Sequence, residues 1–526
     1  MSIARKPIRL NRTVLSLLGL MGTMLLISAY FIIRFGGLWS ENDTGSFSVL
    51  IRNFIAAGQI TPKSGPIYSN GYTYQAVSAF VVATTGVDIA LLQQFIYPLT
   101  IGLIVLPAWA AYRELTDSPR GATLATALLC VQPEFLFVML RSSHEKITRT
   151  LLLVCLFLLA RSFRASQRVG SLTIYVLLFY LTAYAMIASN NLLANSFIVA
   201  VAAALGLGWL LSRWGISAWE GGRRLTKRLI YVLLVCLGLV YVFTFYAYQP
   251  ARTNILVLQS IWEQLGALLL DLETSSVNPY AQVSAGWVNL PTYFLVSCAN
   301  WIILLSSVIV WARQGWRWVV RKQPPASQAA WLLWLLYTAF TIQGVGSIII
   351  DISGALAGNL QHRLFPSFAM VAVAMVGAAL SRLRLGSLPR LSRAALASVC
   401  AVVAVLSVLK ATSEPLLSNK WLFYRHEEIA ALRWGDKHLR YAEIWTDFDE
   451  RIMAAYRTEV GRSANRNIPV GFALRPATRS LLRSSVGTWR GERVGQPLPI
   501  PYDALQIYDN GEAALHRLRP TTPYQR

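Results

Sequence analysis

Charged residues, and acidic residues above all, are scarce in this sequence. Only 14% of its 526 residues are charged, and 25 acidic residues stand against 48 basic ones. In a soluble chain such an excess of cations would favour nucleic-acid binding. Here the apolar residues make up 55% of the chain, and they gather in runs of about twenty, the length that crosses ~30 Å of hydrocarbon. The sequence therefore predicts a multi-pass protein whose partner is the lipid bilayer and not nucleic acid.

Cysteine is also scarce, and the usual cofactor motifs are missing. The five cysteines lie in apolar runs without paired spacing, and none follows residue 400, so we expect core thiols and no disulfide framework. No zinc-ligand pattern, phosphate-binding glycine loop or dinucleotide fingerprint is present. We expect no cofactor, with a divalent cation as the less favoured alternative. An enzyme outside the cytoplasm would then need an activated lipid as its donor.

The apolar runs predict an all-α polytopic membrane domain of about 11 spans, with roughly 13 as an upper limit. One further stretch, 72–86, is short and holds Gln75 and three threonines, so we interpret it as a helix on the membrane surface. Counting it as a span would give every later loop the wrong charge. The predicted spans lie near 13–33, 88–112, 121–140, 147–164, 170–188, 191–212, 228–248, 290–312, 327–350, 364–381 and 391–410.

Basic residues are concentrated in residues 1–12 and in every second loop between the predicted spans. Because cytoplasmic loops are enriched in Lys and Arg, we expect the amino terminus inside and the carboxyl terminus outside. The membrane would be a cytoplasmic membrane of the prokaryotic type. The four basic loops are 161–168, 213–228, 313–322 and 382–393.

Three parts of the chain are expected on the outer side of the membrane. Residues 34–87 form a first outer loop with surface helices, and 249–289 form a second large loop with an amphipathic stretch. After residue 410 the charge density rises and no run could span. We therefore predict a membrane domain at 1–410 and a small extracytoplasmic α/β domain at 411–526.

Short patterns predict the elements of this last part. Residues 424–434 and 451–460 have helical spacing, and 441–446 has the pattern of a strand. Asp509-Asn510-Gly511 is a typical hairpin turn between two short strands.

Two acidic residues, Glu41 and Asp43, directly follow the first predicted span. A carboxylate at that boundary can stay ionised while it is partly desolvated, which suits it to accept a proton from a hydroxyl. A solvated loop with two ordinary acids is the alternative. Trp39 and Tyr68 flank this segment and could contact a sugar, although aromatic residues at membrane edges usually form an interfacial belt.

A second group of ionisable residues follows the third predicted span, in the stretch from Arg141 to Arg149. Arg141 offers a planar fork and Lys146 a point charge, and both suit a phosphate. His144 or Glu145 could bind substrate or a metal. The alternative is a polar cap with snorkelling cations.

A third group, Gln361-His362-Arg363, opens the tenth predicted span. His362 and Arg363 could neutralise a leaving phosphate, and interfacial anchoring is the alternative. Asp351 and Glu134 are candidate functional residues because ionisable groups at membrane depth are often functional. The pair Asn190-Asn191 is explained by a short turn.

The order of these features resembles the glycosyltransferase-C (GT-C) superfamily. The likeness is carried by Glu41-Asn42-Asp43 after the first span, the aromatic segment 68–74, the segment 141–146 and an outer C-terminal domain. It implies a membrane glycosyltransferase that takes a sugar from a polyprenyl-phosphate donor, with inversion, for a glycan, lipid or protein acceptor. It also implies Asp43 or Glu41 as the general base.

The segment 141–145 is similar to an outer loop of oligosaccharyltransferase catalytic subunits, in which an Arg-Ser stretch precedes acidic residues. Here His144 stands where an acid is expected, and the C-terminal part lacks the Trp-Trp-Asp motif with which those enzymes hold a peptide. We therefore favour transfer of a single sugar. The alternatives are an oligosaccharyltransferase-like or glycan-ligase enzyme and a flippase for a lipid-linked glycan. A flippase predicts paired repeats and spans broken by Gly or Pro, and neither is evident.

Overall fold

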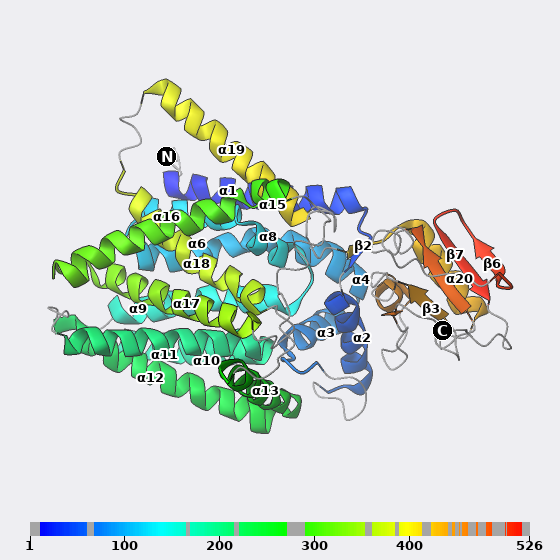
Figure 1. Cartoon of the computed structure of the whole chain (residues 1–526), viewed down its shortest axis with the longest axis horizontal. Coiled ribbons are helices and arrows are strands. Elements are labelled where there is room, and N and C mark those ends of the chain that lie inside the picture. Colours follow the sequence, from blue (N-terminus) through cyan, green and yellow to red (C-terminus); the bar gives the residue numbers. More distant parts are fainter. Residues whose placement is uncertain are drawn as a thin grey trace, which may run out of the picture.

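The computed structural model contains a bundle of long helices with a small β-sheet beyond one end (Figure 1). It describes residues 11–40, 42–59, 68–164, 169–214, 220–270, 290–352, 360–383, 389–412, 422–439, 444–447, 452, 455–460, 470–471, 480–485, 500 and 502–517.

Every predicted span coincides with helix. These segments are α1 (Arg12–Phe35), α4 to α6 (Ile89–Thr116), α7 (Pro119–Cys130) with α8 (Pro133–Leu140), α9 (His144–Arg164), α10 (Val169–Ser189), α11 (Asn191–Arg213), α12 (Glu220–Val242) with the π-helix η4 (Phe243–Ala247), α15 (Leu290–Val296) with α16 (Cys298–Gly315), α17 (Gln328–Ile352), α18 (Leu360–Leu380) and α19 (Arg390–Thr412).

Among the described residues, 7 helices are long and apolar enough to cross a membrane, and the pair α7–α8, bent by 70°, would be an eighth. These helices indicate an integral membrane protein, while the count of eleven spans stays a prediction. The helices on either side of the predicted basic loops end or begin at the end of the bundle away from the sheet (Figure 1), which agrees with the predicted alternation of charge. Which end faces the cytoplasm also stays a prediction.

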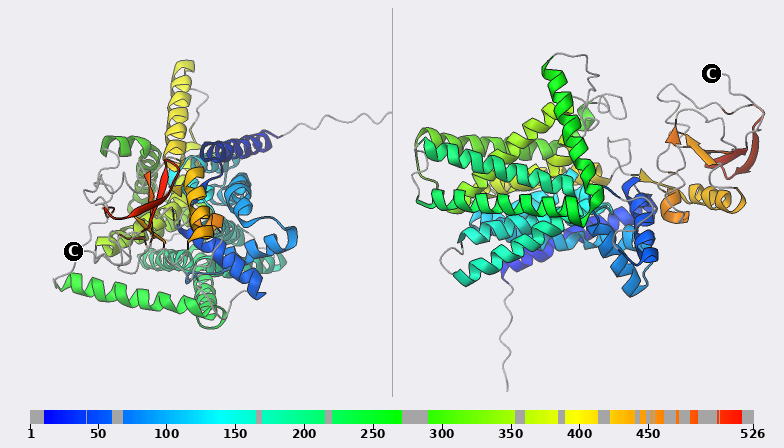
Figure 2. Two further views of the ribbon diagram at one scale, coloured as in Figure 1. Left: turned by 90° about the vertical axis from the view of Figure 1, so that its right-hand side faces the viewer. Right: turned by 90° about the horizontal axis from the view of Figure 1, so that it is seen from below.

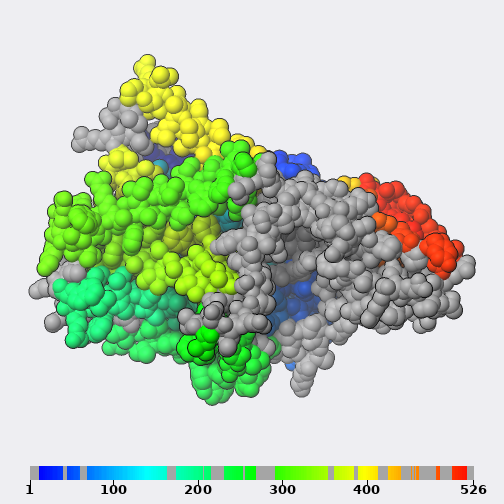
Figure 3. Space-filling view, viewed as in Figure 1, coloured from blue at the N-terminus to red at the C-terminus, as the bar shows by residue number. Residues whose placement is uncertain are grey.

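Small residues bring the central helices into close contact. A Cβ added to Gly377 of α18 would lie 2.7 Å from the carbonyl oxygen of Gly121 in α7, so only glycine allows this approach. Elsewhere in the core the rings of Trp331 and Trp334 stack at 5.4 Å. The helix α19 is different, because its residues 390–402 are all exposed (Figures 2 and 3). Its Cys400 is exposed, so the expectation of a core thiol is wrong there, whereas Cys130, Cys155 and Cys236 are buried.

Two short helices cover the end of the bundle that faces the sheet. α2 (Asn42–Ala57) lies across that end, and α3 (Thr73–Thr85) packs beside it (Figure 1). The helix predicted at 72–86 is thus present as α3. It ends at Gly86, whose φ of +70° favours glycine. Between α4 (Ile89–Leu91) and α5 (Tyr97–Leu99) lies the π-helix η1 (Leu92–Ile96), and the 3-10 helix η2 (Thr100–Ile104) follows, ahead of α6 (Val105–Thr116).

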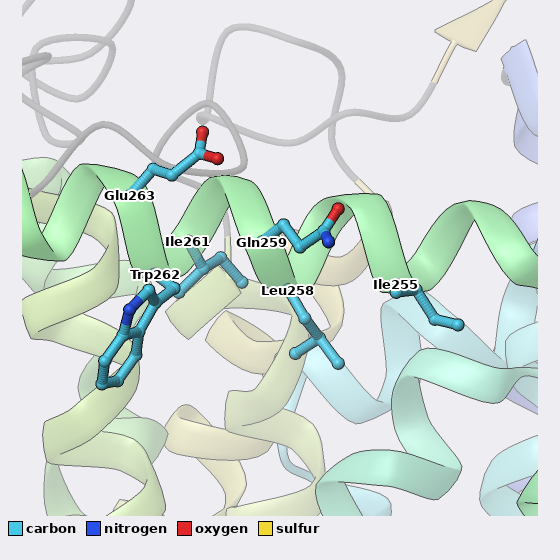
Figure 4. A pocket seen from close by; sticks show the side chains of 6 residues that line it. All are labelled: Ile255, Leu258, Gln259, Ile261, Trp262 and Glu263. Atoms are coloured by element: carbon cyan, nitrogen blue, oxygen red, sulfur yellow. The ribbon is translucent and has the colours of Figure 1, made fainter.

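The second predicted outer loop contains the 3-10 helix η5 (Gln249–Arg252) and α13 (Thr253–Leu269). Figure 4 shows Gln259 and Glu263 on one side of α13 and Leu258 and Trp262 on the other. The amphipathic stretch expected in this loop is therefore confirmed within the described residues.

The C-terminal part has its own small core. Its elements are α20 (His426–His438), β3 (Ile444–Asp447), the π-helix η11 (Tyr456–Val460), β4 (Val470–Gly471), β5 (Ser480–Ser484), β6 (Leu505–Asp509) and β7 (Ala513–Arg517). The strand order is β4-β3-β5-β7-β6, with β3 parallel to its two neighbours and β7 antiparallel to its own. The predicted hairpin is present, and Gly511 has a φ of +87° in its turn. The domain boundary at residue 410 stays a prediction.

Candidate functional site

The segments predicted to carry chemistry meet at the end of the bundle that faces the sheet. There α2 begins, the chain passes from α8 to α9 and from α10 to α11, and α18 begins (Figure 1). Since helix connections that alternate along a bundle share one end, residues far apart in sequence come together. The geometry therefore allows the acidic segment and the two groups of cations to serve one site.

The acidic segment lies against the segment that begins at Arg141. Glu41 falls outside the described residues, and of Asp43 only the backbone is described, in the first turn of α2. The next residue, Thr44, is fully buried and donates from Oγ1 to the carbonyl oxygen of Ser142 at 3.1 Å. Residues separated by 98 positions are thus joined directly. This contact brings the first two predicted groups together.

The aromatic residues beside the acidic segment lie in different environments. Trp39 is only 1% exposed, and its indole N–H donates to the carbonyl oxygen of Gln94 at 3.3 Å. Tyr68 is half-buried, and its hydroxyl lies 3.4 Å from Nε2 of His144. Buried indoles usually need such a partner, so the position of Trp39 indicates a structural role. The sugar contacts predicted for both aromatic residues stay predictions.

His144 is held from two sides at the first turn of α9. Besides Tyr68, Asn190 donates from Nδ2 to Nε2 of His144 at 2.6 Å, and Oδ1 of Asn190 accepts from the amide of Leu193 at 3.1 Å. The turn expected at Asn190 therefore exists, and its side chain also fixes the histidine. A histidine oriented in this way is suited to a defined contact with a bound substrate.

Arg141 and Glu145 form an ion pair at 2.7 Å, four residues apart. The guanidinium of Arg141 also lies over the ring of Phe137, 4.9 Å from its centre. Both side chains are about nine-tenths buried. Among the described residues, Glu145 forms its ion pair with Arg141 and none with Lys146 or Arg149 of the same helix.

Lys146 and Arg149 are both buried, and no carboxylate of the described residues lies within 4.0 Å of either cation. Lys146 donates to the carbonyl oxygen of Tyr97, and its Nζ lies 5.8 Å from the centre of that ring. Arg149 donates to the hydroxyl of Ser367 and, at 2.7 Å, to the carbonyl oxygen of Arg363. A buried charge costs free energy unless it is neutralised. The two cations therefore mark a place suited to an anion.

The third predicted group joins this place through its backbone. Arg363, whose carbonyl oxygen accepts from Arg149, and His362 are both exposed on the first turn of α18. Asp351 has a structural part here, because its two carboxylate oxygens accept from the amides of Leu360 and Gln361, each at 2.8 Å. It thus caps the helix that presents His362 and Arg363.

No family model and no curated protein matches this chain. Solved structures do match. The archaeal oligosaccharyltransferase AglB from Archaeoglobus fulgidus, in complex with an inhibitory peptide and a dolichol-phosphate, is similar with a TM-score of 0.56 at 12% identity, over 89% of this chain and 69% of AglB. ArnT from Cupriavidus metallidurans, bound to undecaprenyl phosphate, is similar with a TM-score of 0.54 at 11% identity, over 95% of this chain and 97% of ArnT. The chain has a GT-C fold.

A second buried cluster of the bundle is centred on Glu134 of α8. Glu134 pairs with Lys410 of α19 and also accepts from Gln132 at 2.7 Å and from Nδ2 of Asn300. The amide of Gln132 reaches Asn300 as well, at 2.9 Å. The cluster therefore ties α8, α16 and α19 together with its charges matched. We assign the cluster a structural role, although the sequence alone makes Glu134 a candidate functional residue.

Several residues of the candidate site are not predicted from the sequence as members of a site. Thr44, Asn190 and Arg149 gain their importance from tertiary contacts, and the sequence shows only the polar surplus around Arg149. Gln93 and Gln94 give one visible signal, since two adjacent glutamines interrupt an apolar run. They also lie in the π-helix η1, a feature frequently found at functional sites.

Proposed function

We propose that this chain is a membrane glycosyltransferase that transfers a sugar from a polyprenyl-phosphate-linked donor to an acceptor on the extracytoplasmic face. The observation that carries the proposal is the presence of the buried cations Lys146 and Arg149 in the first two turns of α9, the helix preceded by Ser142, whose carbonyl oxygen accepts from Thr44 at the start of α2. A donor of this class presents a phosphate to the cations and a sugar to the acid. The shared fold supports this choice, since AglB and ArnT were solved with dolichol-phosphate and undecaprenyl phosphate.

In the proposed reaction a carboxylate of the acidic segment removes the proton of an acceptor hydroxyl. Asp43 is the proposed base, and Glu41 orients the hydroxyl or acts as the alternative base. The hydroxyl oxygen forms a bond to the anomeric carbon, and the bond from that carbon to the phosphate oxygen breaks with its electron pair. The lipid phosphate leaves with one more negative charge, and the configuration at the anomeric carbon of the sugar is inverted.

Cations next to the departing phosphate would lower the barrier, because they stabilise charge that develops only in the transition state. Arg141, Lys146, His362 and Arg363 are the proposed groups, with Arg149 behind them. Tyr68, His144 and Glu145 would position the donor, His144 because it is held by Asn190 and Glu145 because it orients Arg141. Trp39 would keep the acidic segment in place.

An oligosaccharyltransferase-like reaction is the second candidate, favoured by the likeness to AglB. It would move a preassembled glycan and require a larger acceptor groove, with a divalent cation if Glu145 is a ligand. Within the described part of the chain, no three His, Cys, Asp or Glu residues form a group that could hold a metal ion. Glu41 and the side chain of Asp43 lie outside that part.

The proposal is tested by transfer of radiolabelled sugar from a panel of polyprenyl-phosphate sugars, with membrane extract as the acceptor source. Wild type and Asp43→Asn are compared, each with and without a chelator. We expect the variant to lose transfer and the chelator to have no effect. Full transfer by the double variant Asp43→Asn, Glu41→Gln would overturn the assignment of the base. No transfer from any donor, while labelled lipid crosses reconstituted bilayers, would favour a flippase.

A further inference from the structure

Two adjacent glutamines, Gln93 and Gln94, lie buried in η1 at the centre of the contacts around the acidic segment. Their side chains point to different parts of the molecule, and the proposed chemistry uses neither. In a π-helix the turn is wider than in an α-helix, and here the carbonyl oxygens of both glutamines accept bonds from side chains outside the helix, those of Ser142 and Trp39. Each glutamine therefore bonds through its backbone and through its side chain.

Gln93 holds the residues that follow the acidic pair. Its Nε2 donates to the carbonyl oxygen of Thr44 at 3.5 Å and to the hydroxyl of Tyr74 at 3.3 Å, and its Oε1 accepts from Ser48. Its carbonyl oxygen accepts from the hydroxyl of Ser142, which belongs to the segment of cations. One residue thus bonds both α2 and the connection between α8 and α9.

Gln94 holds the residues that precede the acidic pair. Its carbonyl oxygen accepts from the indole of Trp39 at 3.3 Å. Its Nε2 donates to the hydroxyl of Tyr424 at 2.7 Å and to Oε1 of Glu459 at 2.8 Å, and that hydroxyl donates to the same Glu459 oxygen at 3.0 Å. Burial and the Glu459 carboxylate raise the pKa of Tyr424 well above its usual value, so its hydroxyl stays a donor.

The C-terminal part is attached to the same place through its backbone. Strand β1 (Trp39–Ser40) pairs antiparallel with β2 (Leu422–Phe423). The amide of Tyr424 donates to the carbonyl oxygen of Leu38 at 2.8 Å. The chain immediately before Glu41 is therefore fixed by Gln94 and by β2.

We infer that Gln93 and Gln94 are positioning residues, which fix the acidic segment from both sides against the segment of cations and link it to the C-terminal part through Tyr424 and Glu459. The inference rests on the proposed function, because it assigns the catalytic step to the acidic segment. A reacting group that is displaced by about 1 Å can lower the rate on the order of 100-fold. A device that holds residues 39 and 44 therefore has a direct effect on the reaction.

The alternative is that both glutamines only satisfy buried polar groups, as any glutamine in a membrane bundle must. The chain offers a matched control in Gln343 of α17, whose Nε2 donates to the carbonyl oxygen and the hydroxyl of Ser196 at 2.9 and 2.8 Å. Gln343→Leu removes two side-chain hydrogen bonds between α17 and α11, as many as Gln94→Leu removes and one fewer than Gln93→Leu. Any general effect of losing a bundle glutamine appears in this variant too.

The first experiment needs no substrate, and its outcome is independent of the proposed reaction. Hydrogen–deuterium exchange is measured on the full chain in lipid nanodiscs for wild type, Gln93→Leu, Gln94→Leu and Gln343→Leu. We expect the peptide that covers residues 36–48 to exchange about tenfold faster in the first two variants, on the scale of a lost buried hydrogen bond, and to be unchanged in the control. Unchanged exchange of this peptide in both variants would overturn the inference. If Gln93→Leu does not fold, Gln93→Glu, which keeps the shape and loses the donor, takes its place.

The second experiment measures transfer kinetics with the polyprenyl-phosphate sugar that wild type uses. We expect kcat to fall about 10- to 100-fold in Gln93→Leu and Gln94→Leu, with the KM for the donor within about twofold, because the cations are untouched. A fall no larger than in Gln343→Leu would contradict a positioning part. Absence of transfer by wild type would contradict the proposed function alone, since the exchange result stands without it.

An exchange of residues tests the link to the C-terminal part. Gln94→Glu places a second carboxylate beside Glu459, and we expect it to be the least active single variant. The double variant Gln94→Glu, Glu459→Gln restores an amide–carboxylate bond with the roles reversed, and we expect it to regain at least about tenfold in kcat over Gln94→Glu. No gain in the double variant would show that Gln94 and Glu459 act independently and would overturn this link.

Discussion

The two buried clusters of charge in the bundle differ in how their charges are matched. Around Glu134 one carboxylate meets one ammonium, Lys410, and two amides complete its hydrogen bonds. At the candidate site Glu145 is already paired with Arg141, and Lys146 and Arg149 bond only to hydroxyl and carbonyl oxygens among the described residues. A matched cluster can stabilise a fold by itself, whereas a surplus of buried cations indicates an anionic ligand.

The comparison predicts opposite effects for the removal of one lysine from each cluster. Lys410→Met leaves Glu134 buried without its cation, so we expect the free energy of unfolding to fall by about 3–5 kcal/mol. Sugar transfer per folded molecule should be retained. Unfolding in mixed micelles measures the loss, and Lys410→Met combined with Glu134→Leu should recover most of it. Wild-type stability of the single variant would contradict the assignment of this cluster.

At the candidate site the same change affects the reaction instead. Lys146→Met removes a cation proposed to stabilise the leaving phosphate, so we expect kcat to fall about 100- to 1000-fold. The free energy of unfolding should change by no more than about 1 kcal/mol, the net value of one hydrogen bond. Paired measurements of transfer and unfolding on one preparation check this. A large loss of stability with normal transfer per folded molecule would contradict this, because it would give Lys146 the structural role that we assign to Lys410.

Binding of a lipid phosphate alone sharpens the comparison without any chemistry. At a concentration 100 times its Kd, a ligand of the folded state stabilises it by about 2.7 kcal/mol. We expect undecaprenyl phosphate to raise the Tm of wild type and of Lys410→Met, and to have little effect on Arg149→Met. Undecaprenol, which lacks the phosphate, is the control lipid. Equal Tm shifts with both lipids would show that the cations do not bind the phosphate.

The smallest expected effect concerns His144. Asn190→Ala removes the bond to His144 and the cap of α11, so we expect a loss of about 1 kcal/mol in stability, with a rise in the KM for the donor. Asn191→Ala at the next position is the matched control, because Oδ1 of Asn191 has no hydrogen-bond partner among the described residues. The two variants are compared by thermal unfolding and by donor titration. Identical results would remove His144 from the donor site.

The parts of the fold that could be predicted from the sequence are those that depend on local patterns. Apolar runs locate the helices, and the hairpin at Gly511 follows from three adjacent residues whose preferences are local. The end of the bundle on which the three charged groups meet follows from the alternation of loops. The number of spans is harder to predict, because an apolar run does not show whether a helix such as α7 bends before it crosses.

The contacts that build the candidate site could not be predicted in the same way. Thr44 and Ser142 are ordinary loop residues in the sequence, and their hydrogen bond depends on how α2 lies across the bundle. Gln94 reaches Glu459 over 365 positions. The sequence does show which side chains are suited to bind a phosphate, but only the packing shows that Lys146 is buried with no carboxylate of the described residues in an ion pair with it.

The most direct test is an experimental structure of the full chain in nanodiscs with undecaprenyl phosphate bound. We predict that the phosphate lies within hydrogen-bonding distance of Lys146 or of the residues around Arg149 and Arg363, on the side of the bundle end where α2 begins. A phosphate beside Glu134 and Lys410, or at the opposite end of the bundle, would contradict the claim that the surplus cations form the donor site.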